Sequence, residues 1–261
     1  MRALRLSIGL LTVIPVGDIG DVDRRLARSA MLLAPVVGLV LGTLGALVLI
    51  AVHALVPTTL GALLAAVLAL STLAYLTRAL HLDGLADTAD ALGSGKRAEV
   101  ALEIARRGDV GPFGVVTLLF VLLVQASALA VAIESGWGAP ALILAVVTGR
   151  VAAVLACTRG IPPARPDGLG ALVAGTIPRI ASAAWVVVIV IGAFGVGMWL
   201  GASGVWALPL AVVVGLALAL AIVARSVRRL GGITGDVLGA SVEVAATAAL
   251  VALALGASVS P

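Results

Sequence analysis

The stretch Ser29–Thr77, SAMLLAPVVGLVLGTLGALVLIAVHALVPTTLGALLAAVLALSTLAYLT, decides the fold class of this chain. It contains no Asp, Glu, Lys or Arg. A membrane-spanning helix needs about 20 mostly apolar residues, so the stretch is long enough for two. A turn over His53–Thr59, which contains Pro57, separates the two halves. The stretch therefore predicts a helical hairpin across a membrane.

The composition of the whole chain supports the same interpretation. Of its 261 residues, 62% are apolar and 11% are charged, whereas roughly 25% are charged in a soluble domain. This balance excludes a soluble globular protein and a disordered one. Runs with little or no charge predict five further spans: Val110–Ile133, Trp137–Cys157 with Arg150 inside it, two within Ile180–Ala224 divided by a turn at Gly201–Gly204, and Val237–Val259. We expect an all-α, polytopic bundle of seven spans, forming a single domain over residues 1–261.

The basic residues indicate how the bundle is oriented. The segment before the first span and the loops 78–111, 158–179 and 225–240 carry Arg and Lys, while the intervening turns carry none. The positive-inside rule then places the N-terminus and these loops in the cytoplasm and the C-terminus outside the bacterial inner membrane. Met1–Val16 is expected to be an interfacial or re-entrant segment, because Pro15 interrupts its apolar run too early for a signal peptide.

The scarcity of cysteine and of dense basic tracts excludes a disulfide-linked fold, a cysteine-based zinc-binding fold and a nucleic-acid-binding protein. The single cysteine, Cys157, rules out an intramolecular disulfide and a cysteine-based zinc site. No Lys and Arg tract is dense enough to suggest that the chain binds nucleic acid. The lipid bilayer is the expected partner, and the sequence leaves a homo-oligomer open.

The polar motif His81-Leu-Asp83-Gly-Leu-Ala-Asp87-Thr-Ala-Asp90 is the most informative one. In a helix the three aspartates share one face and repel each other. A divalent cation would turn this repulsion into coordination, and carboxylate oxygens favour magnesium or manganese. A solvated helix face at the membrane boundary is the alternative. His81 lies off that face and is interpreted as a ligand, a general base, a phosphate partner or a plain interfacial histidine.

A second motif, Gly231-Gly-Ile-Thr-Gly235-Asp236, lies on the same predicted side of the membrane. Clustered glycines let the backbone approach a ligand closely, and their N–H groups bind phosphate oxygens. Asp236 would complete a metal site with the aspartate triplet. The alternative is a flexible loop that leads into the last helix, with Asp236 as the N-cap.

Arginines in the charged loops are candidates for binding a diphosphate. Arg106 and Arg107 precede Asp109, and Arg165 precedes Asp167. The planar guanidinium group suits phosphate oxygens, although membrane topology alone also explains basic loops. Arg150 lies within an apolar span, where an ionisable residue is rare and usually functional.

Together these motifs resemble the cobalamin synthase family, the adenosylcobinamide-GDP ribazoletransferases. The resemblance runs over almost the whole chain and is carried by Leu11-Thr-Val-Ile-Pro15, the His81–Asp90 block, Gly108-Asp-Val-Gly-Pro-Phe-Gly114, Gly149-Arg150, Ala164-Arg-Pro-Asp-Gly-Leu-Gly170 and Gly231–Ala240. Two positions depart from the family pattern. Arg106–Asp109 replaces a Lys-Asp-Ser-Arg-like run, and Ala246 occupies the region beyond Glu243 where another acid is expected.

The resemblance implies a magnesium-dependent membrane enzyme. Its substrates would be adenosylcobinamide-GDP and α-ribazole or α-ribazole 5′-phosphate, and its products adenosylcobalamin or its 5′-phosphate and GMP. We expect catalytic roles for His81, Asp83 and Asp87, and metal binding by Asp83, Asp87, Asp90 and Asp236. The expected substrate-binding residues are Arg78, Arg107, Asp109, Arg150, Arg165, Gly231, Gly232, Thr234 and Gly235.

Two other functions remain alternatives. CDP-alcohol phosphotransferases share the Asp-Gly start and spaced aspartates at a membrane face, but their Ala-Arg after Asp-Gly and their later Gly-x-x-x-Asp-x-x-x-Asp are missing here. An ion-coupled transporter would also use buried acids, usually near the bilayer midplane. The acids of this chain gather at predicted helix ends instead, so their depth in the bundle discriminates between the two classes.

Overall fold

The computed structural model describes residues 1–201 and 204–258. In a bilayer every backbone group must be hydrogen-bonded within the protein, so long apolar runs form helices. Seven helices in the described ranges are long and apolar enough to span a membrane: α3 (Ala34–Leu55), α4 (Thr59–Leu76), α7 (Pro112–Glu134), α8 (Gly138–Ala156), α10 (Arg179–Leu200), α11 (Gly204–Leu230) and α12 (Gly235–Ser258). They confirm the seven predicted spans. Residues 202 and 203 of the predicted Gly201–Gly204 turn, and Val259 at the end of the predicted last span, lie outside the described residues.

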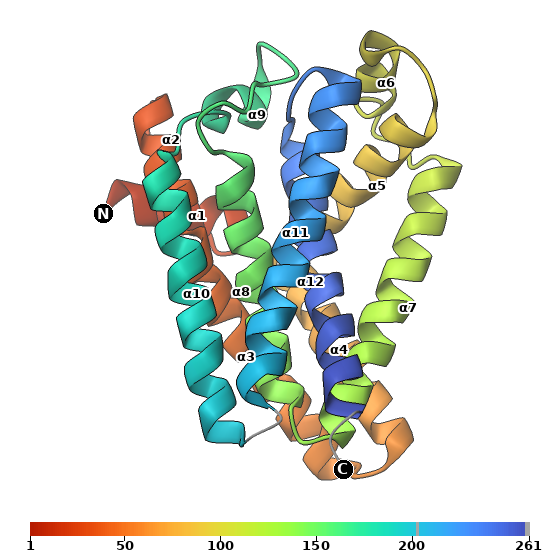
Figure 1. Ribbon diagram of the computed structural model, residues 1–261. Coiled ribbons are helices and arrows are strands. Elements are labelled where there is room, and N and C mark those ends of the chain that lie inside the picture. Colours follow the sequence, from red (N-terminus) through yellow and green to blue (C-terminus); the bar gives the residue numbers. More distant parts are fainter. Residues whose placement is uncertain (202–203, 259–261) are drawn as a thin grey trace.

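Five shorter helices lie at one end of the bundle: α1 (Arg2–Leu11), α2 (Arg24–Leu32), α5 (Leu80–Gly93), α6 (Ala98–Ile104) and α9 (Gly168–Val173). Figure 1 shows them in its upper half, together with the long loops, whereas the last turns of α12 lie at the opposite end. All the loops predicted to be basic therefore meet at the same end. The placement of this end in the cytoplasm stays a prediction.

The centre of the bundle is formed by α8 and α12, which are its most buried spans. Small residues let the helices approach closely, as is usual in membranes. A Cβ atom added to Gly149 would lie 2.8 Å from the carbonyl oxygen of Val242, so α8 and α12 touch backbone to backbone there. The outer helices keep large apolar side chains exposed, among them Leu47 and Ile191, which is expected of a surface that faces lipid.

A sharp turn between α4 and α5 positions the polar end of the bundle. Arg78 and Ala79 have φ values of 55° and 54°, in the left-handed region that residues other than glycine seldom adopt. The Arg78 guanidinium group donates hydrogen bonds to the carbonyl oxygens of Gly9, at 3.0 Å, and Leu10, at 3.3 Å. The same turn therefore starts α5 and fixes α1 beside it.

Candidate active site

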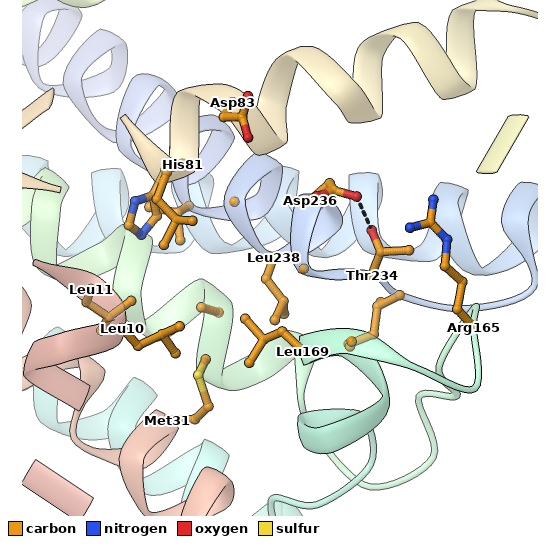
Figure 2. A pocket seen from close by; sticks show the side chains of 18 of the residues that line it. Leu10, Leu11, Met31, His81, Asp83, Arg165, Leu169, Thr234, Asp236 and Leu238 are labelled. Atoms are coloured by element: carbon orange, nitrogen blue, oxygen red, sulfur yellow. Dashed lines mark hydrogen bonds between the residues drawn. The ribbon is translucent and has the colours of Figure 1, made fainter. Parts of the chain in front are cut away.

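A cavity of about 390 Å³ lies at the end of the bundle where α1, α2, α5, α8, α9 and α12 meet (Figure 2). Six of the predicted site residues line it: His81, Asp83, Arg165, Thr234, Gly235 and Asp236. They come from three segments that are far apart in the sequence. The fold thus brings the aspartate motif, the glycine motif and one of the predicted arginines together in a single cavity.

Two glycines allow α5 and α12 to approach each other at this cavity. A Cβ atom at position 84 would lie 2.7 Å from the carbonyl oxygen of Asp236, and one at position 239 would lie 3.2 Å from the Cα atom of Gly84. No side chain fits at either position without a shift of one helix. The glycine that follows Asp83 is therefore required for packing, and its consequence is that Asp83 lies close to Asp236.

The aspartates of α5 differ in exposure and in charge environment. Asp83 is exposed and Asp87 is half-buried. Burial, followed by the negative charges of Asp236, Asp83 and Asp90, raises the pKa of Asp87 from 3.8 to about 7, and the Arg165 charge only partly offsets this. The cavity end of α5 therefore carries more negative charge than nearby protein cations neutralise.

Asp90 has a structural role that the sequence did not predict. Its two carboxylate oxygens accept hydrogen bonds from the backbone N–H groups of Gly111, at 2.8 Å, and Gly114, at 3.0 Å. These groups lie at the N-terminus of α7, where a carboxylate stabilises the helix. Asp90 is buried, so it anchors α7 on α5, and metal coordination by Asp90 stays a prediction.

Thr234, and not Asp236, is the N-cap of α12. The Thr234 Oγ1 atom accepts a hydrogen bond from the N–H of Val237 at 3.3 Å and donates one to Asp236 Oδ2 at 3.1 Å. Asp236 follows as the second residue of the helix, half-buried and lining the cavity. The alternative interpretation of Asp236 as a helix cap is therefore wrong.

The glycine loop packs against protein backbone along much of its length. Ile233 N donates to the Pro162 carbonyl at 3.0 Å, and Ala164 N donates to the Ile233 carbonyl at 2.9 Å. A Cβ atom at Gly232 would collide with the backbone of Pro163 and Ala164. Gly232 thus serves loop-to-loop contact, Gly231 is exposed with a positive φ, and only Gly235 of the predicted glycines lines the cavity.

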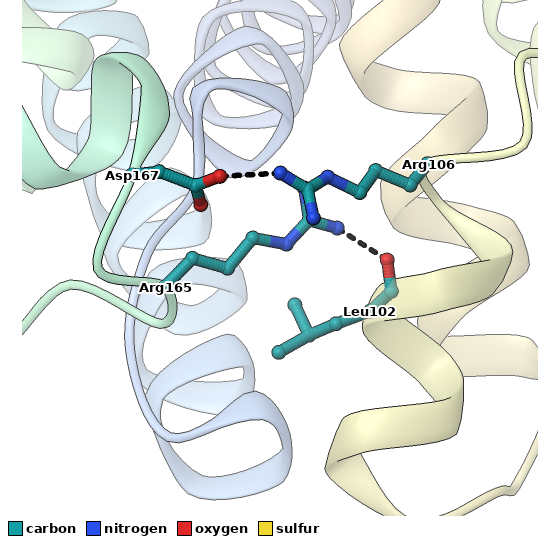
Figure 3. Close-up of polar contacts among 4 residues, drawn as sticks. All are labelled: Leu102, Arg106, Arg165 and Asp167. Carbon is teal, nitrogen blue, oxygen red and sulfur yellow. Dashed lines mark hydrogen bonds and ion pairs between the residues drawn. The ribbon is translucent and has the colours of Figure 1, made fainter.

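Two arginines connect the loops at the rim of the cavity (Figure 3). Arg106 forms an ion pair with Asp167, and Arg165 donates a hydrogen bond to the carbonyl oxygen of Leu102. Both contacts join the α6 region to the loop before α9. Arg165 is close to the carboxylates of Asp87 and Asp236. Its positive charge offsets part of the rise in the pKa of each.

Three other predicted substrate-binding residues lie away from the cavity lining. Arg107 and Asp109 are exposed, and Arg78 binds the carbonyl oxygens at the end of α1. None of the three is among the residues that line the 390 Å³ cavity. For Arg78 the structure shows a role in fixing α1.

Arg150 and His81 are two buried polar residues deeper in the protein. His81 and Arg150 are 4% and 6% exposed, and His81 Nδ1 and Arg150 Nε have no hydrogen-bond partner among the described residues. Burial and the Arg150 charge lower the pKa of His81 well below its ordinary value. His81 is therefore neutral and lines the main cavity, while Arg150 lines a smaller one of about 50 Å³ beside Gln125 and Glu243.

The donor groups at the cavity suit a hard divalent cation. Asp83 and Asp236 line the cavity and Asp87 lies next to them. Their carboxylate oxygens are the ligands that magnesium prefers, and their mutual repulsion favours a nearby positive charge. Within the described ranges, no three His, Cys, Asp or Glu side chains form a ready-made metal cluster. The residue types and charges fit magnesium, which usually binds to a few carboxylates together with substrate phosphates.

Comparison with known proteins identifies the family. A model of the cobalamin-5-phosphate synthase family matches residues 3–254. The chain belongs to this family. It is 43% identical to the adenosylcobinamide-GDP ribazoletransferase of Frankia casuarinae over an alignment of 264 positions. The alignment covers 98% of this chain and 95% of the relative. The enzyme of the same name from Nocardioides sp. is 42% identical, with 97% and 98% covered. No solved structure matches the chain.

The family resemblance predicted from the motifs is thus confirmed. As a cobalamin-5-phosphate synthase family member, the chain is a multi-pass membrane enzyme, a transferase of cobalamin biosynthesis. Neither the CDP-alcohol phosphotransferase nor the transporter alternative is favoured by these matches. The acids of the cavity also lie at helix ends, as the enzyme interpretation requires.

The cavity of this cobalamin-5-phosphate synthase family member also contains residues that sequence reasoning missed. Apolar side chains from four helices line a large part of it: Leu10, Leu11, Met31, Leu169 and Leu238. In a chain that is 62% apolar, residue type does not distinguish them from membrane-facing residues, although Leu11, Leu169 and Leu238 lie within motifs that carry the family resemblance. Asp167 also lines the cavity, and its place in the Arg165-Pro-Asp167 motif was the one available signal.

Proposed function

We propose that this chain joins adenosylcobinamide-GDP to α-ribazole, or to α-ribazole 5′-phosphate, and releases GMP. The observation that carries the proposal is that Asp83 on α5 and Asp236 on α12 line one cavity together with Arg165. Asp87 lies next to this lining, close enough for the charges of Asp83 and Asp236 to raise its pKa. The names of the relatives support adenosylcobinamide-GDP as one substrate. The product would be adenosylcobalamin, or its 5′-phosphate.

The chemistry is a displacement at phosphorus. A ribose hydroxyl of the ribazole other than the 5′ one, which carries the phosphate in α-ribazole 5′-phosphate, attacks the phosphorus that bears the cobinamide arm. A new P–O bond forms, and the P–O bond to GMP breaks. Such transfers depend on positioning and charge neutralisation more than on covalent catalysis. The hydroxyl proton needs an acceptor, and His81 is suited to it because its Nδ1 is unpartnered and its lowered pKa keeps the ring neutral.

Magnesium is proposed as the cofactor, held by Asp83, Asp87 and Asp236. When bound, it supplies positive charge next to the diphosphate oxygens. The pKa of Asp87, raised by burial and then by the charges of Asp236, Asp83 and Asp90, supports this assignment, because a bound cation would offset those charges. Asp90 is left out of the proposed ligands, since both of its oxygens are hydrogen-bonded to the N-terminus of α7.

Arg165 is the proposed contact for the diphosphate of adenosylcobinamide-GDP. It lies at the rim, half-buried, on the same side of the cavity as Asp236. The neighbouring ion pair between Arg106 and Asp167 joins the loop that carries Arg165 to the segment that follows α6. We also propose that this end of the bundle faces the cytoplasm of a bacterial inner membrane, in keeping with its basic loops.

The experiment that tests the function uses the purified chain in detergent. Adenosylcobinamide-GDP, α-ribazole and magnesium are added, and the release of GMP is followed. The proposal expects one GMP for each cobalamin formed, and no GMP when α-ribazole is omitted or EDTA is present in excess. GMP release that does not depend on α-ribazole would show a hydrolase and would contradict the proposal.

A further inference from the structure

The cavity has two halves of different chemistry. Asp83, Asp236 and Arg165 lie along one side, whereas Leu10, Leu11, Met31, Leu169 and Leu238 gather on the other (Figure 2). The apolar half is built mainly by the N-terminal helices α1 and α2 together with α9 and α12. Its labelled side chains are hydrocarbon or thioether groups that form no strong hydrogen bonds.

The apolar half selects against a polar base. Guanine carries several N–H and C=O groups on its edges, and each one buried without a partner costs free energy. A benzimidazole ring has carbon-bound edges and a single free ring nitrogen, so it loses little in such surroundings. The surface therefore suits the base of α-ribazole better than the guanine of adenosylcobinamide-GDP.

The position of His81 agrees with a nucleoside in this cavity. Its buried Nδ1 has no hydrogen-bond partner among the described residues, and Figure 2 shows His81 between Leu11 and Asp83. A sugar attached to a base in the apolar half would reach this nitrogen and the carboxylates beyond it. The ribose hydroxyl that attacks the phosphorus would then lie on the side where the reaction takes place.

The size of the cavity points to the smaller substrate. Its volume is about 390 Å³, near the lower end of the roughly 300–1,000 Å³ that is common for small-molecule sites. A nucleoside fits in such a space. A corrin macrocycle that carries a nucleotide does not, so most of adenosylcobinamide-GDP must remain outside and present only its diphosphate at the Arg165 side.

We propose that Leu10, Leu11, Met31, Leu169 and Leu238 form the subsite for the base of α-ribazole, and that α1 and α2 thereby determine which nucleoside the enzyme accepts. This inference rests on the proposed function. It adds a role for the N-terminal helices, of which α1 is fixed against the start of α5 by Arg78.

Two matched pairs of variants test the subsite. Leu10 and Leu6 are both half-buried on α1, but only Leu10 lines the cavity. Leu169 and Leu172 are both half-buried on α9, and only Leu169 lines it. The KM values for α-ribazole and for adenosylcobinamide-GDP are measured separately for Leu10→Ala, Leu169→Ala, Leu6→Ala and Leu172→Ala.

The inference expects a selective effect. Leu10→Ala and Leu169→Ala should each raise the KM for α-ribazole by about tenfold, as is typical when an apolar contact is removed from a binding pocket. The KM for adenosylcobinamide-GDP should stay within about twofold, and the two control variants should match the wild type. A rise in the KM for adenosylcobinamide-GDP instead, or unchanged KM values for both substrates, would overturn the subsite.

A binding measurement separates this inference from the proposed function. Equilibrium dialysis with labelled α-ribazole needs no turnover, so it reports on the subsite even for a protein that releases no GMP. Binding by the wild type that is weakened in Leu169→Ala and kept in Leu172→Ala supports the subsite. Equal binding by all variants, or no binding by the wild type, contradicts it. Wild-type binding without GMP release would contradict the proposed function alone.

Discussion

Gly84 of α5 lies directly against the backbone of Asp236 at the start of α12. A Cβ atom at position 84 would be 2.7 Å from the Asp236 carbonyl oxygen and 3.0 Å from its Cα atom. The contact brings the helix that carries Asp83 and Asp87 against the helix that carries Asp236. The site therefore depends on a residue that has no functional group of its own.

Gly84→Ala is expected to separate these two helices. Overpacking of a closely packed contact typically costs about 1–3 kcal/mol, so the melting temperature and GMP release should both fall. Gly192→Ala on α10 is the control, because a Cβ atom there meets nothing within 4 Å and alanine is the better helix former. Equal activity of the two variants would show that the Gly84 contact does not set the geometry of the site.

Asp83 and Asp90 should respond differently to the same substitution. Asp83→Asn is expected to keep the fold and lose at least about 100-fold in GMP release, since even indirect partners of a metal cost 10–100-fold. Asp90→Asn removes a charged acceptor of two backbone N–H groups, a loss of about 1.5–3 kcal/mol per charged hydrogen bond at most. It should lower the melting temperature and keep activity per folded molecule. If Asp90→Asn lost activity and kept the wild-type melting temperature, Asp90 would have to be counted among the metal ligands.

The raised pKa of Asp87 predicts how stability depends on pH without metal. Its folded-state pKa of about 7 exceeds the ordinary value of 3.8, so the folded protein holds a proton that the unfolded chain releases. Stability from this group is complete below pH 4 and is lost as the pH rises to 7. Asparagine never ionises. In EDTA, Asp87→Asn should therefore melt at a higher temperature than the wild type at pH 8 and at a similar temperature at pH 4.

Magnesium provides the matching control for that comparison. It should raise the melting temperature of the wild type at pH 8 and leave Asp87→Asn nearly unchanged, because a ligand stabilises only the state that binds it. A wild type that melts above Asp87→Asn in EDTA at pH 8 would contradict a pKa of Asp87 that burial and the neighbouring carboxylates raise.

The orientation in the membrane is testable by cysteine labelling. The only native cysteine, Cys157, is fully buried and should give no background. Glu103 and Ser135 are exposed at opposite ends of the bundle. In sealed cells an impermeant maleimide should label Ser135→Cys and not Glu103→Cys. The reverse pattern would place the site outside the cell.

Much of the fold could be predicted from the sequence because the bilayer imposes a strong pattern. An uncharged run as long as Ser29–Thr77 has few alternatives to a pair of spanning helices, and the basic loops then sort to one end. The chemistry of the site was also visible, because acids such as Asp83 and Asp236 are rare in so apolar a chain.

The remaining features of the site depend on contacts between distant segments. Asp90 looks equivalent to Asp87 in the sequence, and only the position of the α7 N-terminus shows that it binds Gly111 and Gly114. Thr234 and Asp236 are both good N-cap residues, and the start of α12 decides between them. The apolar wall around Leu169 could not be predicted, because membership of the Ala164–Gly170 motif does not show that Leu169 lines a cavity.

The most direct test of the central claim is GMP release by Asp236→Asn. Thr234 supplies the cap of α12, so the variant should fold like the wild type and melt at a similar temperature. The account predicts that GMP release from adenosylcobinamide-GDP and α-ribazole falls at least about 100-fold, while Thr234→Ser, which keeps a hydroxyl at the cap, stays active. An Asp236→Asn enzyme that releases GMP at the wild-type rate would contradict a site shared by α5 and α12.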